Sequence, residues 1–181
     1  MTHDGRLATD EGGRDVGMLT LLPMTEDVFE VWFDASITRQ AEDRAWASGR
    51  SVSIEHERLL QMIPRLLPHG MHTAKHTFWM AKQSSDDLVG GLWLGPAPGM
   101  PGDDRFLFDI FVEPEHRNQG FGRWMLETAL TRLCDQGIPR VTLNVRGDNA
   151  SALSLYRRLG FQPVGDSTGA RWMTMTCPLT D

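Results

Sequence analysis

One stretch constrains the fold more than any other: an apolar strand that runs into a glycine-containing turn and then a helix. Residues 106–112 read Phe-Leu-Phe-Asp-Ile-Phe-Val, and the turn that follows contains Gly120 and Gly122. The first N–H groups of a helix have no partner inside the helix, and the helix dipole is positive at that end. Glycines let a ligand come close to the backbone, so this turn can bind a phosphate. Arg117 and Arg123 add positive charge at its rim.

Two common nucleotide-binding motifs do not fit this turn. A Walker A loop requires a Gly-Lys-Ser/Thr segment, which the chain lacks. A dinucleotide fingerprint requires a third glycine three residues after Gly122, where the chain has Met125. On its own, the turn is equally compatible with an ordinary strand–helix connection or with another kind of anion-binding α/β module.

A second stretch, residues 149–161, predicts a short helix that presents one Asn and one Tyr. Asn149 is a favoured residue for the start of a helix, and Gly160 is favoured at its end. Tyr156 is the one tyrosine of the chain. Its hydroxyl, with an ordinary pKa of about 10, stays protonated at neutral pH and can donate a proton. The alternative for Tyr156 is simple packing at a helix end.

Together the two stretches resemble the GNAT superfamily of N-acetyltransferases. The segment Arg117-x-x-Gly120-x-Gly122, after a Val-x-Pro strand end, is similar to the acyl-CoA pyrophosphate loop of that superfamily. The second stretch is similar to its other signature, through Asn149-x-x-Ala152-x-x-Leu155-Tyr156-x-x-Leu159-Gly160-Phe161. The resemblance implies an N-acetyltransferase that moves an acetyl group from acetyl-CoA to a primary amine of a small molecule or peptide. The amine would attack directly in a ternary complex.

The resemblance and the hydrophobic pattern imply an α/β (α+β) fold in one domain. We expect a mixed central sheet of about six to seven strands, flanked by about four helices. Residues 1–17 are polar and are expected to be a disordered tail, and residues 18–181 to be the N-acetyltransferase domain. The second helix is expected to be capped by Ser53 and to be kinked or ended by Pro64.

The resemblance also implies where the cofactor binds. In this superfamily the signature strand and the next strand splay apart, and the acyl carrier enters the gap. Ile110 and Val112 would then lend backbone groups to the pantetheine arm. Asn149 matches a cofactor-contacting position as well as being a helix cap. The pyrophosphate would be wrapped by Arg117, Asn118, Gln119, Gly120, Phe121, Gly122 and Arg123.

Three chemical requirements point to catalytic residues. The amine must lose a proton, the thioester oxygen must be stabilised, and the departing sulfur needs a proton or a hydrogen bond. The resemblance assigns the last role to Tyr156. Asp109 is a candidate general base, because its side chain faces away from those of Ile110 and Val112; a water chain, or a carboxylate with no catalytic role, are the alternatives. Members that acetylate ribosomal-protein N-termini carry a glutamate where this chain has Asn144, which cannot accept a proton and so argues against that substrate class.

Composition narrows the class of partner. The net charge of −6 argues against nonspecific nucleic-acid binding and suits a cationic acceptor. No apolar run reaches membrane-spanning length and no apolar signal segment is present, so we expect a cytoplasmic protein without a membrane partner. The histidines His69, His72 and His76 straddle a Pro-Gly loop with no completing acid or cysteine, so no metal site is expected.

Several alternatives stay open at this point. The donor could be a longer acyl-CoA, or the chain could be a non-catalytic acyl-CoA sensor of the same fold. An N-terminal protein acetyltransferase is a third reading, weakened by Asn144. The acceptor amine and the oligomeric state, including a homodimer, do not follow from the sequence.

Overall fold

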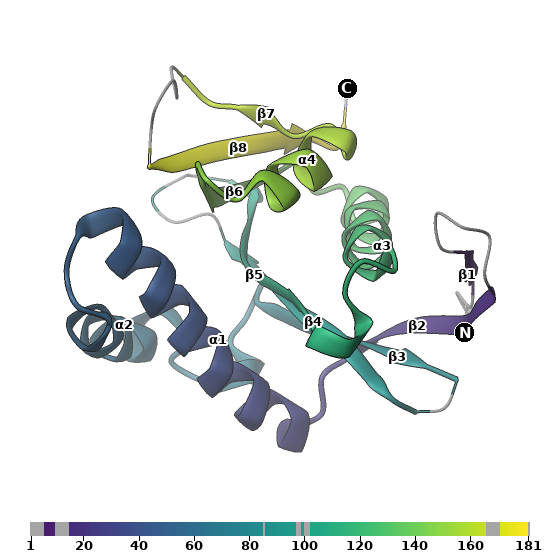
Figure 1. Cartoon of the computed structure of the whole chain (residues 1–181), viewed down its shortest axis with the longest axis horizontal. Coiled ribbons are helices and arrows are strands. Elements are labelled where there is room, and N and C mark those ends of the chain that lie inside the picture. The colour runs from purple at the N-terminus through teal and green to yellow at the C-terminus, as the bar shows by residue number, and fades with distance from the viewer. Residues whose placement is uncertain are drawn as a thin grey trace.

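The structure, a computed structural model, describes residues 6–9, 15–84, 86–96, 99, 102–165 and 171–180. In this part of the chain eight strands form one sheet, in the spatial order β1-β2-β3-β4-β5-β6-β8-β7 (Figure 1). The strands are β1 Arg6–Thr9, β2 Asp15–Pro23, β3 Thr77–Gln83, β4 Leu88–Pro96, β5 Arg105–Val112, β6 Arg140–Arg146, β7 Gln162–Pro163 and β8 Trp172–Pro178. The α-helices are α1 Glu26–Ser48, α2 Val52–Leu66, α3 Phe121–Asp135 and α4 Ala150–Arg158, with short 3-10 helices η1 Gly70–His72 and η2 Pro114–His116.

The expected α/β fold class is confirmed, with a mixed sheet flanked by helices. The sheet begins earlier in the chain than the sequence pattern indicated. Strand β1 lies within the range expected to be a disordered tail, and it pairs antiparallel with β2, whose first residue is Asp15. Residues 1–5 and 10–14 lie outside the described residues. The boundary of the domain at residue 18 stays a prediction.

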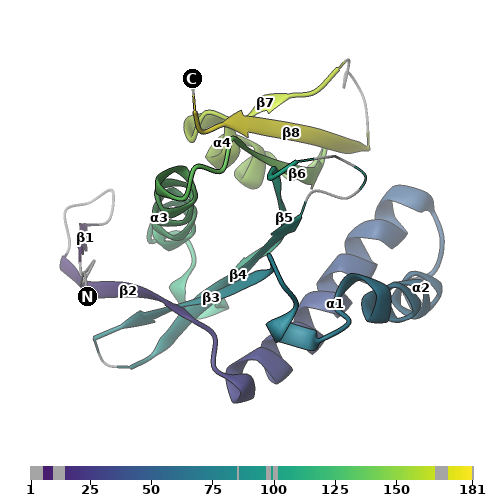
Figure 2. The ribbon, with the colours of Figure 1, turned by 180° about the vertical axis from the view of Figure 1, so that it is seen from behind.

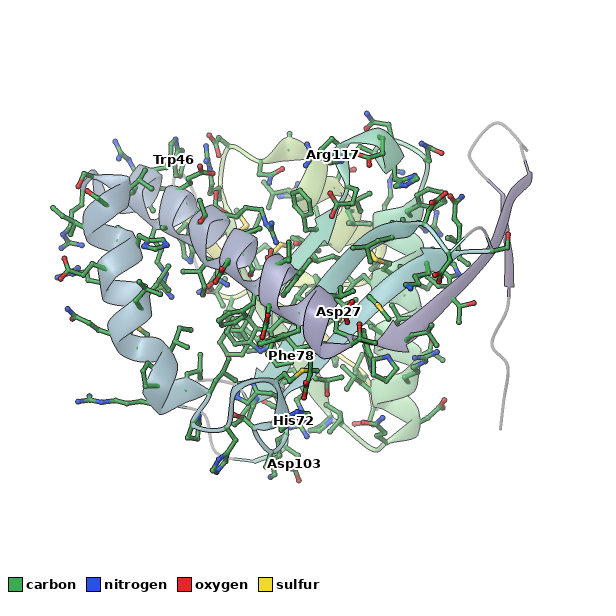
Figure 3. All side chains as sticks on the ribbon, turned by 90° about the horizontal axis from the view of Figure 1, so that it is seen from below. Asp27, Trp46, His72, Phe78, Asp103 and Arg117 are labelled. Atoms are coloured by element: carbon green, nitrogen blue, oxygen red, sulfur yellow. The ribbon has the colours of Figure 1, made fainter. Side chains whose placement is uncertain are left out.

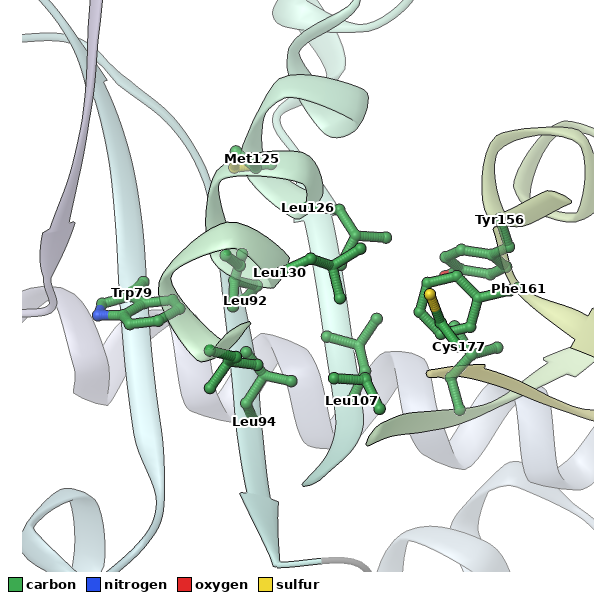
Figure 4. Close-up of a cluster of buried hydrophobic side chains, with 14 of the residues drawn as sticks. Trp79, Leu92, Leu94, Leu107, Met125, Leu126, Leu130, Tyr156, Phe161 and Cys177 are labelled. Carbon is green, nitrogen blue, oxygen red and sulfur yellow. The ribbon is translucent and has the colours of Figure 1, made fainter. Parts of the chain in front are cut away.

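The sheet separates two apolar clusters, one on each face. On β4, Leu92 and Leu94 pack toward α3, whereas Trp93 between them packs toward α1 and α2. This alternation follows from the two-residue repeat of a strand. Figures 1 and 2 show α1 and α2 on one face and α3 on the other, and Figure 4 shows the cluster beneath α3. Figure 3 shows α1 lying across its face of the sheet, from Asp27 near its start to Trp46 near its end.

The second helix differs from the sequence expectation at both ends. Its cap is Ser51 rather than Ser53, since the Ser51 side chain accepts a hydrogen bond from the Ile54 N–H. The helix continues through Pro64 and ends at Leu66. Proline removes one N–H donor from a helix, but the next turn is closed by the Leu67 N–H, which donates to the Ile63 carbonyl at 2.7 Å. Pro64 therefore does not end the helix, and the other expected effect, a kink at Pro64, stays a prediction.

Strand β5 contains a bulge at the point where it leaves β6. Trp93 and Leu94 on β4 oppose Asp109 and Leu107 on β5, so Phe108 is an extra residue. Strands β5 and β6 are parallel and pair over Arg105–Leu107 and Val141–Leu143. Beyond these residues β6 continues to pair with β8. The expected splay between the signature strand and its neighbour is therefore present.

His76 packs against the apolar cluster beneath α1, and its contacts predict that the stability of the fold depends on pH. Its Nδ1 accepts a hydrogen bond from Trp93 Nε1 at 3.0 Å, and its ring lies 5.7 Å from that of Phe108. Burial, and then the charge of Arg105, lower the pKa of His76 below its ordinary value. Protonation of Nδ1 would also remove the acceptor for Trp93.

We therefore expect the free energy of unfolding to decrease as the pH falls below about 6.5, the ordinary histidine pKa. The sign follows because the unfolded chain binds the proton more readily than the folded chain does. Urea unfolding at pH 7.5, 6.5 and 5.5 measures the effect, and His76→Gln should weaken the pH dependence. His69→Gln, at an exposed histidine, is the control; an equal change in both variants would contradict the role of His76.

Candidate active site

A cavity of about 1420 Å³ opens where β5 and β6 separate. Its walls come from β5, the turn after β5, the start of α3, β6, α4, and the helices α1 and α2. Every residue that the sequence assigned to the site lines this one cavity: Asp109, Ile110, Val112, Arg117, Asn118, Gln119, Gly120, Phe121, Gly122, Arg123, Asn149 and Tyr156. The fold therefore brings the two sequence stretches together.

The turn before α3 depends on left-handed backbone conformations. Asn118 has φ 60° and Gly120, the N-cap of α3, has φ 82°. The second glycine, Gly122, has no positive φ, and a Cβ there would be in ordinary van der Waals contact, 3.4 Å from Val112 Cγ2. The first N–H groups of α3 lack helical partners and lie at the cavity.

One edge of β5 faces the gap between β5 and β6. The Glu113 N–H donates to the Val89 carbonyl at 2.9 Å. Bonded and non-bonded pairs alternate along an antiparallel ladder, so the backbone groups of Val112 and Ile110 point away from β4 and toward the gap. The Val112 carbonyl accepts a hydrogen bond from Arg117 Nε at 3.0 Å. The turn and the strand edge are thus joined by one arginine.

The other predicted pyrophosphate residues lie around the same turn. Gln119 Nε2 donates to the Glu115 carbonyl at 2.9 Å, which bridges the turn internally. Arg123 Nε lies 3.9 Å from Glu127 Oε2, one helical turn further along α3. Both side chains of that pair are more than half exposed, so the pair contributes little stability and leaves Arg123 able to turn toward an anion.

Tyr156 is buried against the core and reaches the cavity. It is 7% exposed, and its ring centre lies 5.7 Å from that of Phe161 (Figure 4). Burial raises the pKa of Tyr156, and the carboxylates of Asp109 and Asp43 raise it further. The hydroxyl therefore stays protonated at neutral pH. Asn149 caps this helix, because its Oδ1 accepts from the Ala152 N–H at 3.1 Å.

Asp109 is held by an arginine that the sequence analysis did not single out. Arg39 of α1 donates from NH2 to Asp109 Oδ2 at 2.7 Å. The Arg39 guanidinium also lies 4.0 Å from the centre of the Phe111 ring. Within the described residues, the buried Nε of Arg39 has no hydrogen-bond partner. One oxygen of the candidate base is thus already engaged by a fixed cation.

A second carboxylate, Asp43, lines the cavity on the same helix. It lies four residues after Arg39 and accepts from Arg146 of β6 at 3.3 Å. Arg146 is also bonded to Asp148 at 2.7 Å and lies over the Trp46 ring, 4.3 Å from its centre. Burial raises the pKa of Asp43, and the hydrogen bond from Arg146 opposes this shift. Asp43 was missed because α1 carries charged residues all around; the four-residue spacing from Arg39 was the available signal.

Asn144 lies in the cavity wall. Its amide satisfies two neighbours on β8 when its oxygen accepts from Trp172 Nε1 at 3.1 Å and its nitrogen donates to Thr174 at 2.8 Å. An amide used in this way shapes the wall and does not accept a proton.

Among the described residues, no three His, Cys, Asp or Glu side chains are placed so that they could share a metal ion. None of the helices in the described ranges is both long and apolar enough to cross a membrane.

Comparison with known proteins places this chain in a family. The sequence matches the acetyltransferase (GNAT) family over residues 39–161. It is 29% identical to an uncharacterized N-acetyltransferase, YycN from Bacillus subtilis, over 146 residues, which are 80% of this chain and 92% of that protein. The crystal structure of the YycN protein, described as a putative acetyltransferase, aligns with a TM-score of 0.73 over 82% of this chain and 94% of that chain, at 26% identity.

More distant similarities support the fold. The ribosomal protein bS18-alanine N-acetyltransferase of Escherichia coli is 42% identical over 59 residues, which are 33% of this chain and 40% of that protein. Spermidine N-acetyltransferase from Vibrio cholerae, solved with CoA and spermine, has a TM-score of 0.63 over 89% of this chain and 95% of that chain, at 18% identity.

Proposed function

Because the chain belongs to the acetyltransferase (GNAT) family, and so is an acyltransferase, we propose that it transfers an acetyl group from acetyl-CoA to a primary amine of a small molecule or peptide. The observation that carries this proposal is the single cavity. It brings together the start of α3, whose first N–H groups have no helical partner, the edge of β5 that faces away from β4, and a protonated tyrosine. No one of these features would suffice alone.

The cofactor is proposed to lie in the gap where β5 and β6 separate. The pyrophosphate would accept hydrogen bonds from the first N–H groups of α3, with Arg117 and Arg123 adding charge. The pantetheine arm would pair with the exposed backbone groups of Ile110 and Val112, as a short added strand does. To bond the Val112 carbonyl, the arm has to displace Arg117 Nε, which frees that guanidinium for the phosphates.

The reaction is proposed to proceed by direct attack. The amine nitrogen forms a bond to the thioester carbon, the carbon–sulfur bond breaks, and the electron pair goes to sulfur. A backbone N–H on the exposed edge of β5 stabilises the oxygen as it gains charge. Tyr156 donates a hydrogen bond to the sulfur. Since its pKa is raised above that of an ordinary thiol of about 8.5, hydrogen bonding is favoured over complete proton transfer.

The proton of the attacking amine is proposed to leave toward Asp109. Arg39 engages Oδ2 of this carboxylate, so the proton reaches the other oxygen directly or through a water molecule. The carboxylates of Asp109 and Asp43 are each paired with an arginine. Attraction of a cationic amine would therefore come from the net charge of −6, at long range.

A first experiment tests cofactor binding. A ligand present at one hundred times its Kd stabilises the native state by about 2.7 kcal/mol. For a chain of this length, this corresponds to a rise in melting temperature of about 5–10 °C. We expect that rise with CoA and acetyl-CoA and a much smaller one with pantetheine. A response to ATP but not to CoA would contradict the proposed cofactor.

A second experiment tests transfer. Acetyl-CoA is mixed with a panel of polyamines, amino acids and peptides, and the release of free thiol is followed. Release that depends on one class of amine supports the enzyme. Tight CoA binding without release for any amine would favour the sensor, and preferential acetylation of peptide N-termini would favour the protein acetyltransferase.

A further inference from the structure

Three arginines line the cavity on the side of α1 and β6: Arg39, Arg44 and Arg146. Arg39 is paired with Asp109, and Arg146 with two aspartates. Within the described ranges, Arg44 has no ion pair, and its hydrogen-bond contact is with the Met62 sulfur at 3.9 Å. Arg44 is therefore the cation on this side whose charge has no fixed partner.

The one acid whose charge acts appreciably on Arg44, among the described residues, does not pair with it. Glu55 interacts with it through charge alone, since the Glu55 carboxylate oxygen is already bonded to Ser48 and Arg50 at 3.0 Å. Arg44 is half-buried between α1 and α2, and burial lowers the pKa of its guanidinium. A charge partly removed from water is unfavourable unless it finds a partner. An anionic ligand group would supply that partner.

Arg44 lies on the acceptor side of the cavity, away from the proposed phosphate site. Figures 1 and 2 show α1 and α2 on the face of the sheet opposite α3. Along α1, Arg39 and Asp43 form one stripe, and Gln40 and Arg44 form the next, all lining the cavity. Arg44 is five residues beyond Arg39, about 7–8 Å along the helix axis.

Arg44 lies between a charged pocket and the main cavity. The pocket between the helices is lined by Glu55, Arg58, Gln61, Met62 and Arg65. The lining of the main cavity includes apolar side chains from α2 and β5: Leu59, Met62, Ile63, Leu66, Phe106 and Phe108. Met62 is 48% exposed. An acceptor on this surface would place an apolar body there and an anionic end at Arg44.

We propose that Arg44 binds a carboxylate of the acceptor, so that the acceptor is an amino acid or a similar molecule with an apolar body, a primary amine and a carboxylate. This inference rests on the proposed acetyl transfer. A guanidinium binds carboxylate and phosphate alike in a two-pronged geometry, and we choose a carboxylate because its single negative charge matches that of one guanidinium. The nearby Asp43 and Asp109 would repel a second negative charge.

The test compares matched acceptors. Leucine, methionine, phenylalanine and 6-aminohexanoate are each paired with the corresponding amide, which keeps the amine and the body but removes the charge. Wild type should acetylate the acids with a kcat/KM about tenfold or more above the amides, the range for hydrogen bonds to charged groups. In Arg44→Gln, the value for the acids should fall to that for the amides. The values for the amides should stay within about twofold.

Arg65→Gln is the matched control. Arg65 lies beside Arg44 in a smaller pocket between the helices but does not line the main cavity. The same loss of charge there should leave the preference for acids intact. Arg44→Lys, which keeps charge without the planar fork, should restore part of the preference.

The outcomes separate this inference from the proposed function. Equal acetylation of acids and amides by wild type would overturn the role of Arg44 while acetyl transfer stands. A weaker acetyl-CoA affinity in Arg44→Gln would also overturn it, because Arg44 would then serve the cofactor. If no amine is acetylated, acetyl transfer itself fails; calorimetric binding of acids against amides to the CoA-loaded protein then decides about Arg44.

Discussion

Tyr156→Phe is expected to lower turnover by about 10²–10⁴-fold without weakening acetyl-CoA binding. The change removes the hydroxyl and keeps the ring that packs against Phe161. If the hydroxyl hydrogen-bonds the departing sulfur, its contribution is made in the transition state, so the dissociation constant of the cofactor should not change. Single-turnover kinetics and calorimetry on the same preparation measure the two quantities.

Phe161→Leu is the control for packing around Tyr156. Phe161 is 2% exposed and lies beside the tyrosine ring, so its truncation disturbs the same cluster without touching the hydroxyl. It should cost stability but retain most of the turnover. Equal losses of turnover in the two variants would mean that Tyr156 acts through packing. Because the pKa of Tyr156 is raised, wild-type turnover should not decline through ionisation of Tyr156 near pH 10.

Gly120→Val is expected to weaken acetyl-CoA binding by about tenfold or more. Gly120 has φ 82°, a conformation that costs a β-branched residue about 1–3 kcal/mol. The turn relieves this strain by moving, which displaces the N–H groups at the start of α3. No atom lies within 4 Å of a Cβ built at this position, so the effect would come from backbone conformation and not from a clash.

Gly137→Val provides a matched control at the other end of the same helix. Gly137 has φ 74°, and a Cβ there also meets no atom within 4 Å. The backbone strain is thus comparable, but Gly137 does not line the cavity. Both variants should lose similar stability in urea unfolding, and Gly120→Val alone should lose cofactor affinity. Unchanged affinity in Gly120→Val would place the diphosphate elsewhere.

The parts of the site that the sequence predicted are contiguous in the chain. The turn from Arg117 to Gly122 and the helix with Tyr156 each carry their own geometry, through glycine conformations and helix caps. The spacing of these residues in the sequence was therefore enough to predict both segments. The separation of β5 from β6 was predicted as well, although only through the family resemblance.

The parts that were missed depend on packing between distant segments. Arg39 meets Asp109 across 70 positions, and Asp43 meets Arg146 across 103. No local pattern encodes those encounters. The bulge at Phe108 is defined by how β5 pairs with β4. The apolar sequence around Phe108 contains no residue that would indicate a bulge. The helix does not end at Pro64, because a proline in the last turn of a helix removes only one hydrogen bond there.

The short pairing between β5 and β6 has a consequence for how the molecule holds together. The two strands share three pairs, Arg105 to Val141, Phe106 to Thr142 and Leu107 to Leu143. The sheet therefore consists of two parts, β1–β5 and β6–β8, that are joined by these three residue pairs. The ion pair between Arg146 and Asp43 adds a link from β6 to α1. A pantetheine arm lying in the gap would keep β5 and β6 apart and would also connect the two strands. Hydrogen bonds from the amides of such an arm would add to these three pairs, so we expect bound acetyl-CoA to hold the two parts of the sheet together more firmly.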